Sequence, residues 1–204
     1  MHLLYTIFIA LANNIDNISV RIAYSIRGIK ITILINLWIS VITFLISLLA
    51  AFSGTQISGH ISKQYTSIAS MLLLMAIGVW IILEQCIART VPQDEAAHKV
   101  NGKGIFYIMR KPETADMDSS KNIDFKEATI LGIALSINNI GGGLSAGMIG
   151  LNVFFVGFLS ALISFLALWT GNYITEYLNR FKLENKASIL AGIALIAIGI
   201  KQII

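Results

Sequence analysis

The chain has 204 residues, of which 56% are hydrophobic and only 13% are charged. Soluble domains carry about 25% charged residues, so this composition excludes an ordinary soluble domain and indicates an α-helical integral membrane protein. The net charge of +4 reflects the connections between apolar runs and gives no support to nucleic-acid binding. With a single cysteine, Cys86, an internal disulfide is also excluded.

Six apolar runs are long enough to cross a membrane as helices, because a span needs about 20 residues. They cover residues 3–24, 31–52, 67–88, a run that starts near Phe125, 153–175 and 187–204. The first run lacks a basic leader and a small-residue cleavage site, so we expect it to be retained as a helix. Residues 90–122, which contain both prolines, are too polar to span the membrane and form a connection.

The two halves of the chain repeat in order. The matching segments are residues 13–15 with 138–140, 53–57 with 170–174, and 76–79 with 197–200. The predicted units are a first three-helix repeat at 1–89, a polar connecting segment at 90–124 and a second three-helix repeat at 125–204. Because three is odd, the second copy enters the membrane from the opposite side. This predicts an all-α fold of six transmembrane helices in two inverted repeats.

Basic residues gather on one side of this layout. Only Lys63 and Lys201 would lie on the other side. The larger group is Arg27, Lys30, Arg89, Lys99, Lys103, Arg110, Lys111, Lys121, Lys126, Arg180, Lys182 and Lys186. The positive-inside rule places this group, with the connecting segment, in the cytoplasm. We therefore expect a multi-pass plasma-membrane protein with both termini outside.

The most informative stretch is residues 10–19, which places Asp16 inside the first span. An aspartate at the centre of a membrane helix costs roughly 2.5–3.5 kcal/mol, so it is a functional-site hypothesis by default. Asn13, Asp16 and Asn17 share one face of a helix. The alternative is that Asp16 is protonated or hydrogen-bonds between helices. We expect Arg21 to reach the near membrane interface rather than to pair with Asp16.

The fourth span carries the matching motif, with Asn138 and Asn139 in place of the first two asparagines and Gly141 in place of the aspartate. Carboxylate and amide oxygens suit hard cations such as Mn²⁺, Mg²⁺ or Ca²⁺. The predicted transport or metal site is therefore Asp16, Asn13, Asn17, Asn138, Asn139 and Gly141. Glycines 141–143 either expose backbone carbonyls where the helix unwinds or only allow close helix packing.

These paired motifs, the six-span inverted layout and the glycine-rich last helix resemble the bacterial manganese-efflux family of the MntP type. The run from Lys111 to Asp118, followed by Glu127-Ala128, is similar to the branch of that family known as the sporulation membrane protein YtaF. The resemblance covers essentially the whole chain. It implies that an aspartate in each motif moves the cation; Asp16 matches the first, and Gly141 stands at the second.

Three functions follow as hypotheses. The first is an exporter of a divalent cation, driven by an ion or proton gradient because no nucleotide motif occurs. The second is a non-transporting membrane protein of spore or envelope assembly with the same fold. The third is an exporter of amino acids or other small solutes. We expect no enzyme, because no nucleophile–base arrangement occurs. The expected partners are the lipid bilayer and a divalent cation, with no other cofactor, no nucleic acid, and homo-oligomerisation left open.

A second cation site is indicated just before the fourth span, where residues 116–127 have the spacing of a twelve-residue EF-hand loop. Its oxygen ligands for Ca²⁺ or Mn²⁺ would be Asp116, Asp118, Ser120, the backbone of Asn122, Asp124 through water, and Glu127. Lys121 occupies the position where glycine usually makes the sharp turn. The simpler alternative is that Asp124 caps the helix and Glu127 completes a capping box.

The orientation can be tested with reporter fusions. A reporter placed between residues 90 and 122 should be active only in the cytoplasm, and one fused after Ile204 only outside, because the basic residues set the topology. A cytoplasmic signal from the C-terminal fusion would contradict the inverted repeat.

Overall fold

The computed structural model describes residues 2–87, 115–118 and 120–181, and beyond them only residues 193, 196 and 200. Within these residues every regular element is an α-helix, which confirms the all-α prediction. The helices are α1 (His2–Asn14), α2 (Asp16–Arg27), α3 (Ile33–His60), α4 (Lys63–Ile87), α6 (Phe125–Met148) and α7 (Val153–Phe181). Between the helices, Lys30 and Asn122 form an isolated parallel β-bridge.

Four segments in the described part of the chain are long and apolar enough to cross a membrane. They are His2–Ser25, Ile33–His60, Phe125–Met148 and Val153–Thr170, and they correspond to the first, second, fourth and fifth predicted spans. The third predicted span coincides with α4, which is not among these four. Apart from residues 193, 196 and 200, the sixth predicted span lies outside the described residues, as does most of the connecting segment. Six spans and two inverted repeats therefore stay predictions.

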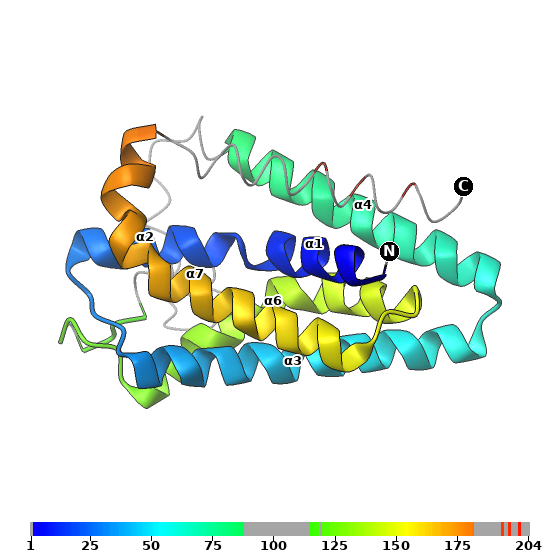
Figure 1. Ribbon diagram of the computed structural model, residues 1–204, viewed down its shortest axis with the longest axis horizontal. Helices are drawn as coiled ribbons and strands as arrows, with labels where there is room; N and C mark the ends of the chain where they lie inside the picture. The colour runs from blue at the N-terminus through cyan, green and yellow to red at the C-terminus, as the bar shows by residue number, and fades with distance from the viewer. Residues whose placement is uncertain are drawn as a thin grey trace, which may run out of the picture.

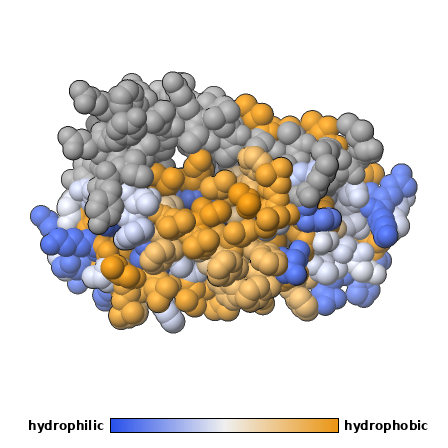
Figure 2. Space-filling model, viewed as in Figure 1, coloured by the Kyte–Doolittle hydropathy of each residue, from blue (hydrophilic) through white to orange (hydrophobic). Residues whose placement is uncertain are grey.

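The helices run mainly along the long axis of the molecule (Figure 1). Helices α3 and α4 follow opposite edges, and α1, α2 and α7 lie between them in this view. Apolar residues form a band over the middle of the visible face, and hydrophilic residues gather at its two ends (Figure 2). An apolar band between polar ends is the surface of a protein whose helices cross the bilayer.

Local signals in the sequence define where the helices begin and end. Gly28 follows α2 with a φ of 72°, a left-handed conformation that favours glycine. The Thr32 side chain accepts a hydrogen bond from Ile35 N at the start of α3. Asp124 caps α6 in the same way, and Gly150, with a φ of 77°, makes the turn toward α7. These four helix ends are thus marked by residues suited to them.

Helices α3 and α6 approach each other closely because both carry glycine at the contact. A Cβ atom at Gly147 would overlap the backbone carbonyl of Ala51, and one at Gly54 would overlap the carbonyl of Leu144. Small residues at such contacts let helix backbones approach within the membrane, where lipid tails provide no hydrophobic drive for association. This pair of helices forms the frame on which the polar centre is built.

This packing yields a stability test with a matched control. Gly147→Ala should lower the unfolding temperature in detergent, with a loss of about 1–3 kcal/mol, because the added methyl group meets backbone that cannot move aside. Gly59→Ala, on α3 with no neighbouring atom in reach, should be neutral or stabilising by about 0.5–1 kcal/mol. Equal unfolding temperatures for the two variants would contradict the close approach of α3 and α6.

Candidate functional site

The first span is interrupted at Ile15, in the middle of the motif. Helix α1 ends at Asn14 and α2 begins at Asp16 (Figure 1), and Ile18 N donates to Ile15 O over only three residues, at 3.3 Å. The Asn14 side chain contributes to the break by donating to Ala10 O at 2.8 Å. A side chain inserted into the backbone ladder is a recognised cause of kinks. The interruption places the Asp16 carboxylate at the beginning of the second half-helix.

Two asparagines from matching positions of the two motifs pair with each other. Asn14 Nδ2 donates to Asn139 Oδ1 at 3.2 Å, and Asn139 Nδ2 donates back to Asn14 Oδ1 at 3.3 Å. Both residues are fully buried. Asn139 was predicted as a possible ligand, but its amide is held by Asn14, a residue outside the predicted set.

A chain of polar contacts extends from this pair across the bundle. Asn17 Nδ2 lies 3.3 Å from Asn14 Oδ1 and 2.9 Å from Ser164 Oγ on α7. Ser164 is also bonded to Thr43 of α3, and Thr43 to Ser136 of α6. The polar centre therefore joins both half-helices of the first span to α3, α6 and α7.

Asp16 is bound by a residue of the second motif. Asn138 Nδ2 donates to Asp16 Oδ2 at 2.6 Å. Asn13 packs against α6, the helix that carries Asn138, because a Cβ atom at Gly142 would overlap the side-chain amide of Asn13. The structure thus brings Asp16, Asn13, Asn17, Asn138 and Asn139 to one place, where the first and fourth spans cross.

Three buried oxygens in this region have no hydrogen-bond donor among the residues that the structure describes. They are Asn13 Oδ1, Asn17 Oδ1 and Ser47 Oγ, on residues that are 3%, 1% and 1% exposed. A buried polar atom without a partner costs roughly 1–3 kcal/mol. Such atoms call for a bound ion or water, because native structures leave few of them unsatisfied.

Gly141 does not face this centre. A Cβ atom there would meet Ile77 of α4 rather than Asn13 or Asp16. Helix α6 runs unbroken from Phe125 to Met148, so of the two alternatives for residues 141–143, local unwinding is wrong. The glycines serve close packing instead, with Gly142 under Asn13 and Gly143 against Ala50.

Arg21 is also placed differently from the prediction. It is 2% exposed, so its side chain does not extend to the interface. Its Nε and Nη1 atoms have no hydrogen-bond partner within the described ranges. The first span therefore contains both a carboxylate and a buried guanidinium.

The loop before α6 gathers three of its predicted ligands. Carboxylate oxygens of Asp116, Asp118 and Glu127 lie within 4.8 Å of one another. Both aspartates accept from Ser120 N, at 3.0 and 2.9 Å. The bond from the Ser120 N–H to Asp118, followed by the Ser120 hydroxyl, lowers the pKa of the Asp118 carboxyl. Lys121 adopts a φ of 61° at the position where an EF-hand usually has glycine.

The capping alternative is confirmed. The Asp124 side chain accepts from Glu127 N at 2.7 Å, and Glu127 accepts from Asp124 N at 3.2 Å. Glu127 also accepts from Met117 N at 2.7 Å. The Ser120 hydroxyl donates to Asn122 O at 2.9 Å and accepts from Asn122 N at 3.2 Å. The loop is docked on the α2–α3 connection, because Ile123 N donates to Lys30 O.

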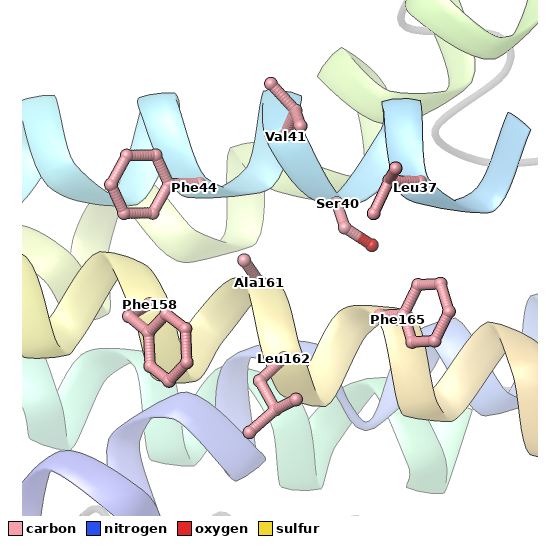
Figure 3. Close-up of a pocket in the computed structure, with 8 residues that line it drawn as sticks. All are labelled: Leu37, Ser40, Val41, Phe44, Phe158, Ala161, Leu162 and Phe165. Carbon is pink, nitrogen blue, oxygen red and sulfur yellow. The ribbon is translucent and has the colours of Figure 1, made fainter. Parts of the chain in front are cut away.

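An apolar cavity of about 330 Å³ lies between α3 and α7, beside Phe44, Phe158 and Phe165 (Figure 3). Its one polar lining residue, Ser40, donates its hydroxyl to Asn36 O. None of the polar residues at the helix break lines it, so this cavity is separate from the candidate site.

The site residues that sequence reasoning missed had a signal in the repeat. Asn14 and Asn139 occupy the same place in the two motifs. Ser47 and Ser164 each lie six residues before the matched pair Ser53 and Thr170. Extending the alignment of the two halves in this way would have found both serines.

Apolar helices around a buried polar centre define a multi-pass helical membrane protein. Residues 101–203, just over half of the chain, match the family described as "Putative manganese efflux pump" (Mntp). The chain belongs to this family. A family of this kind moves solutes rather than catalysing reactions, and it is consistent with a plasma-membrane location.

Two relatives match nearly end to end. The "Probable sporulation protein YtaF" of Bacillus subtilis (strain 168) is 29% identical over 98% of this chain and 99% of its own length. The "Putative manganese efflux pump MntP" of Aliarcobacter butzleri (strain RM4018) is 25% identical over 98% of both chains. No solved structure matches the chain.

Proposed function

We propose that this protein exports a divalent cation, with manganese as the first candidate, through a site at the α1–α2 break. The family and the name of the Aliarcobacter relative support manganese as the cargo. The observation that carries the proposal is the pair of unsatisfied amide oxygens, Asn13 Oδ1 and Asn17 Oδ1, on residues of the same motif as Asp16. Amide and carboxylate oxygens are ligands that hard divalent cations accept.

The helix break contributes to the same chemistry. Where a helix ends, its last carbonyl groups lose their intrahelical partners. The C-terminal end of α1 therefore presents partial negative charge next to Asp16, and such ends coordinate cations in transporters with broken helices. Asn138 holds the carboxylate in place from the opposite helix. Asp16, Asn13 and Asn17 would then bind the ion, while Asn138 and Asn139 position the site.

We also propose six spans arranged as two inverted repeats, with residues 90–124 in the cytoplasm and both termini outside. The reciprocal bonds between Asn14 and Asn139 support this architecture, because equivalent residues of two inverted repeats would meet symmetrically on the pseudo-two-fold axis that relates them. Ser47 and Ser164 support it as well. Asn17 donates to Ser164, whereas Gly142 stands at the equivalent position of the second repeat and leaves Ser47 without that partner. The site would lie where the repeats meet.

A non-transporting role in spore or envelope assembly is the competing function. The name of the Bacillus relative and the glycine at position 141 favour it. A single carboxylate provides one negative charge for an ion that carries two.

The transport function is tested by Asp16→Asn. The change keeps the shape of the side chain and removes its charge, so efflux of radioactive manganese should fall at least tenfold, about 1.4 kcal/mol or more in the barrier. Efflux is measured in a host that lacks its own exporter, with membrane insertion checked by protein level. Ser53→Ala, an exposed hydroxyl on α3 bonded only to its own helix, is the control and should be unchanged.

Equal efflux from Asp16→Asn and the wild type would exclude Asp16 as a ligand. No efflux from either protein, together with a spore-specific defect on deletion, would support the competing function.

We further propose that residues 116–127 bind Ca²⁺ or Mn²⁺ as a second, regulatory site. The clustered oxygens of Asp116, Asp118 and Glu127 and the left-handed Lys121 support it. The capping box does not compete, since each carboxylate oxygen of Glu127 accepts one backbone bond and keeps a second lone pair. The hydrogen bond from Ile123 N to Lys30 O connects the loop to the segment that follows α2, and Asp16 lies at the other end of that helix.

Calorimetry on the full-length protein should detect Ca²⁺ binding with Kd on the order of 10⁻⁴ to 10⁻³ M, as weak loops of this type show. The double change Asp116→Ala with Glu127→Gln should abolish this heat, and Asp16→Asn should leave it intact. Absence of heat with both ions, or binding that survives the double change, would leave the loop with its capping role alone.

A further inference from the structure

Arg21 is a buried charged group of the first span that the proposed transport chemistry does not use. It lies in α2 within the segment His2–Ser25, is 2% exposed, and has two nitrogens without a hydrogen-bond partner in the described part of the chain. A guanidinium is positively charged at any physiological pH. Burying one without satisfying its donors is costly, so a structural role as a hydrogen-bonding group does not explain it.

Arg21 follows Asp16 by five residues on the same half-helix. This spacing places the two Cα atoms about 7.5 Å apart along the axis and on sides of the helix about 140° apart. The two side chains therefore do not pair, and Asp16 is instead bound by Asn138. Both charges nevertheless share the interior of the bundle, where electrostatic interactions reach further than in water.

We propose that Arg21 sets the affinity of the cation site for its ion; this inference rests on the proposed function. Its positive charge repels a divalent ion bound at Asp16. At separations of about 8–12 Å and an effective dielectric constant of about 20, this repulsion weakens binding by at least about tenfold. A site in a conducting pathway must bind its ion weakly enough to release it. Arg21 keeps the affinity of the Asp16 site weak enough for the ion to be released.

The test is Mn²⁺ binding to the full-length protein in nanodiscs, counting only the binding that Asp16→Asn removes. Arg21→Gln should bind Mn²⁺ at least tenfold more tightly, because it keeps a polar side chain and removes the charge. Arg21→Lys retains the charge and should bind like the wild type. Lys30→Gln, which removes an exposed charge from the α2–α3 connection, is the matched control and should change affinity little.

The outcomes separate this inference from the proposed function. Unchanged affinity in Arg21→Gln, with Asp16-dependent binding intact, would overturn the role of Arg21 alone. No Asp16-dependent binding in any variant would overturn the proposed site and this inference with it. A lower unfolding temperature and weaker binding in Arg21→Gln would show that the guanidinium is a structural contact, and would also overturn the inference.

Discussion

The polar centre depends on the reciprocal amide bonds between Asn14 and Asn139. Both side chains are fully buried between helices that face lipid, where an unpaired amide would have no water to bond with. Each amide satisfies the other, so the two motifs are held in a single register. Asn17, Ser164 and the Asp16–Asn138 pair are all positioned relative to this contact. A shift of α6 by one residue would lose both bonds that join the first span to α6, Asn14–Asn139 and Asp16–Asn138.

Glycine makes this arrangement sterically accessible. Gly147 and Gly54 bring α3 against α6, and Gly142 makes room for the amide of Asn13. Gly142 stands where the first motif has Asn17, and this difference has a chemical consequence. Gly142 has no side chain to bond to Ser47, whereas Asn17 bonds to Ser164. The polar groups are therefore unevenly divided between the two halves, and the charged ones belong to the first. This asymmetry is why we assign ion binding to the first span.

Much of the fold was predictable because its signals are local. Apolar length predicted the helices, and the spacing of Asp124 and Glu127 predicted a capping box that the structure contains. The break at Ile15 was not predictable, since Asn14 bonds both to Ala10 O of its own helix and to Asn139, a partner that is distant in sequence. Arg21 was wrongly expected at the interface because the sequence does not show which helices cover it. The sequence left unwinding and close packing open at residues 141–143, because neighbours that are distant in sequence decide between the two.

The most direct test of the account is the position of the bound ion. Crystals of the wild-type protein grown with Mn²⁺ should give an anomalous peak, measured at the manganese absorption edge, at the α1–α2 break. The account predicts this peak about 2.0–2.6 Å from a carboxylate oxygen of Asp16 and from the amide oxygen of Asn13 or Asn17. A peak only at Asp116 and Asp118, with none beside Asp16, would contradict it.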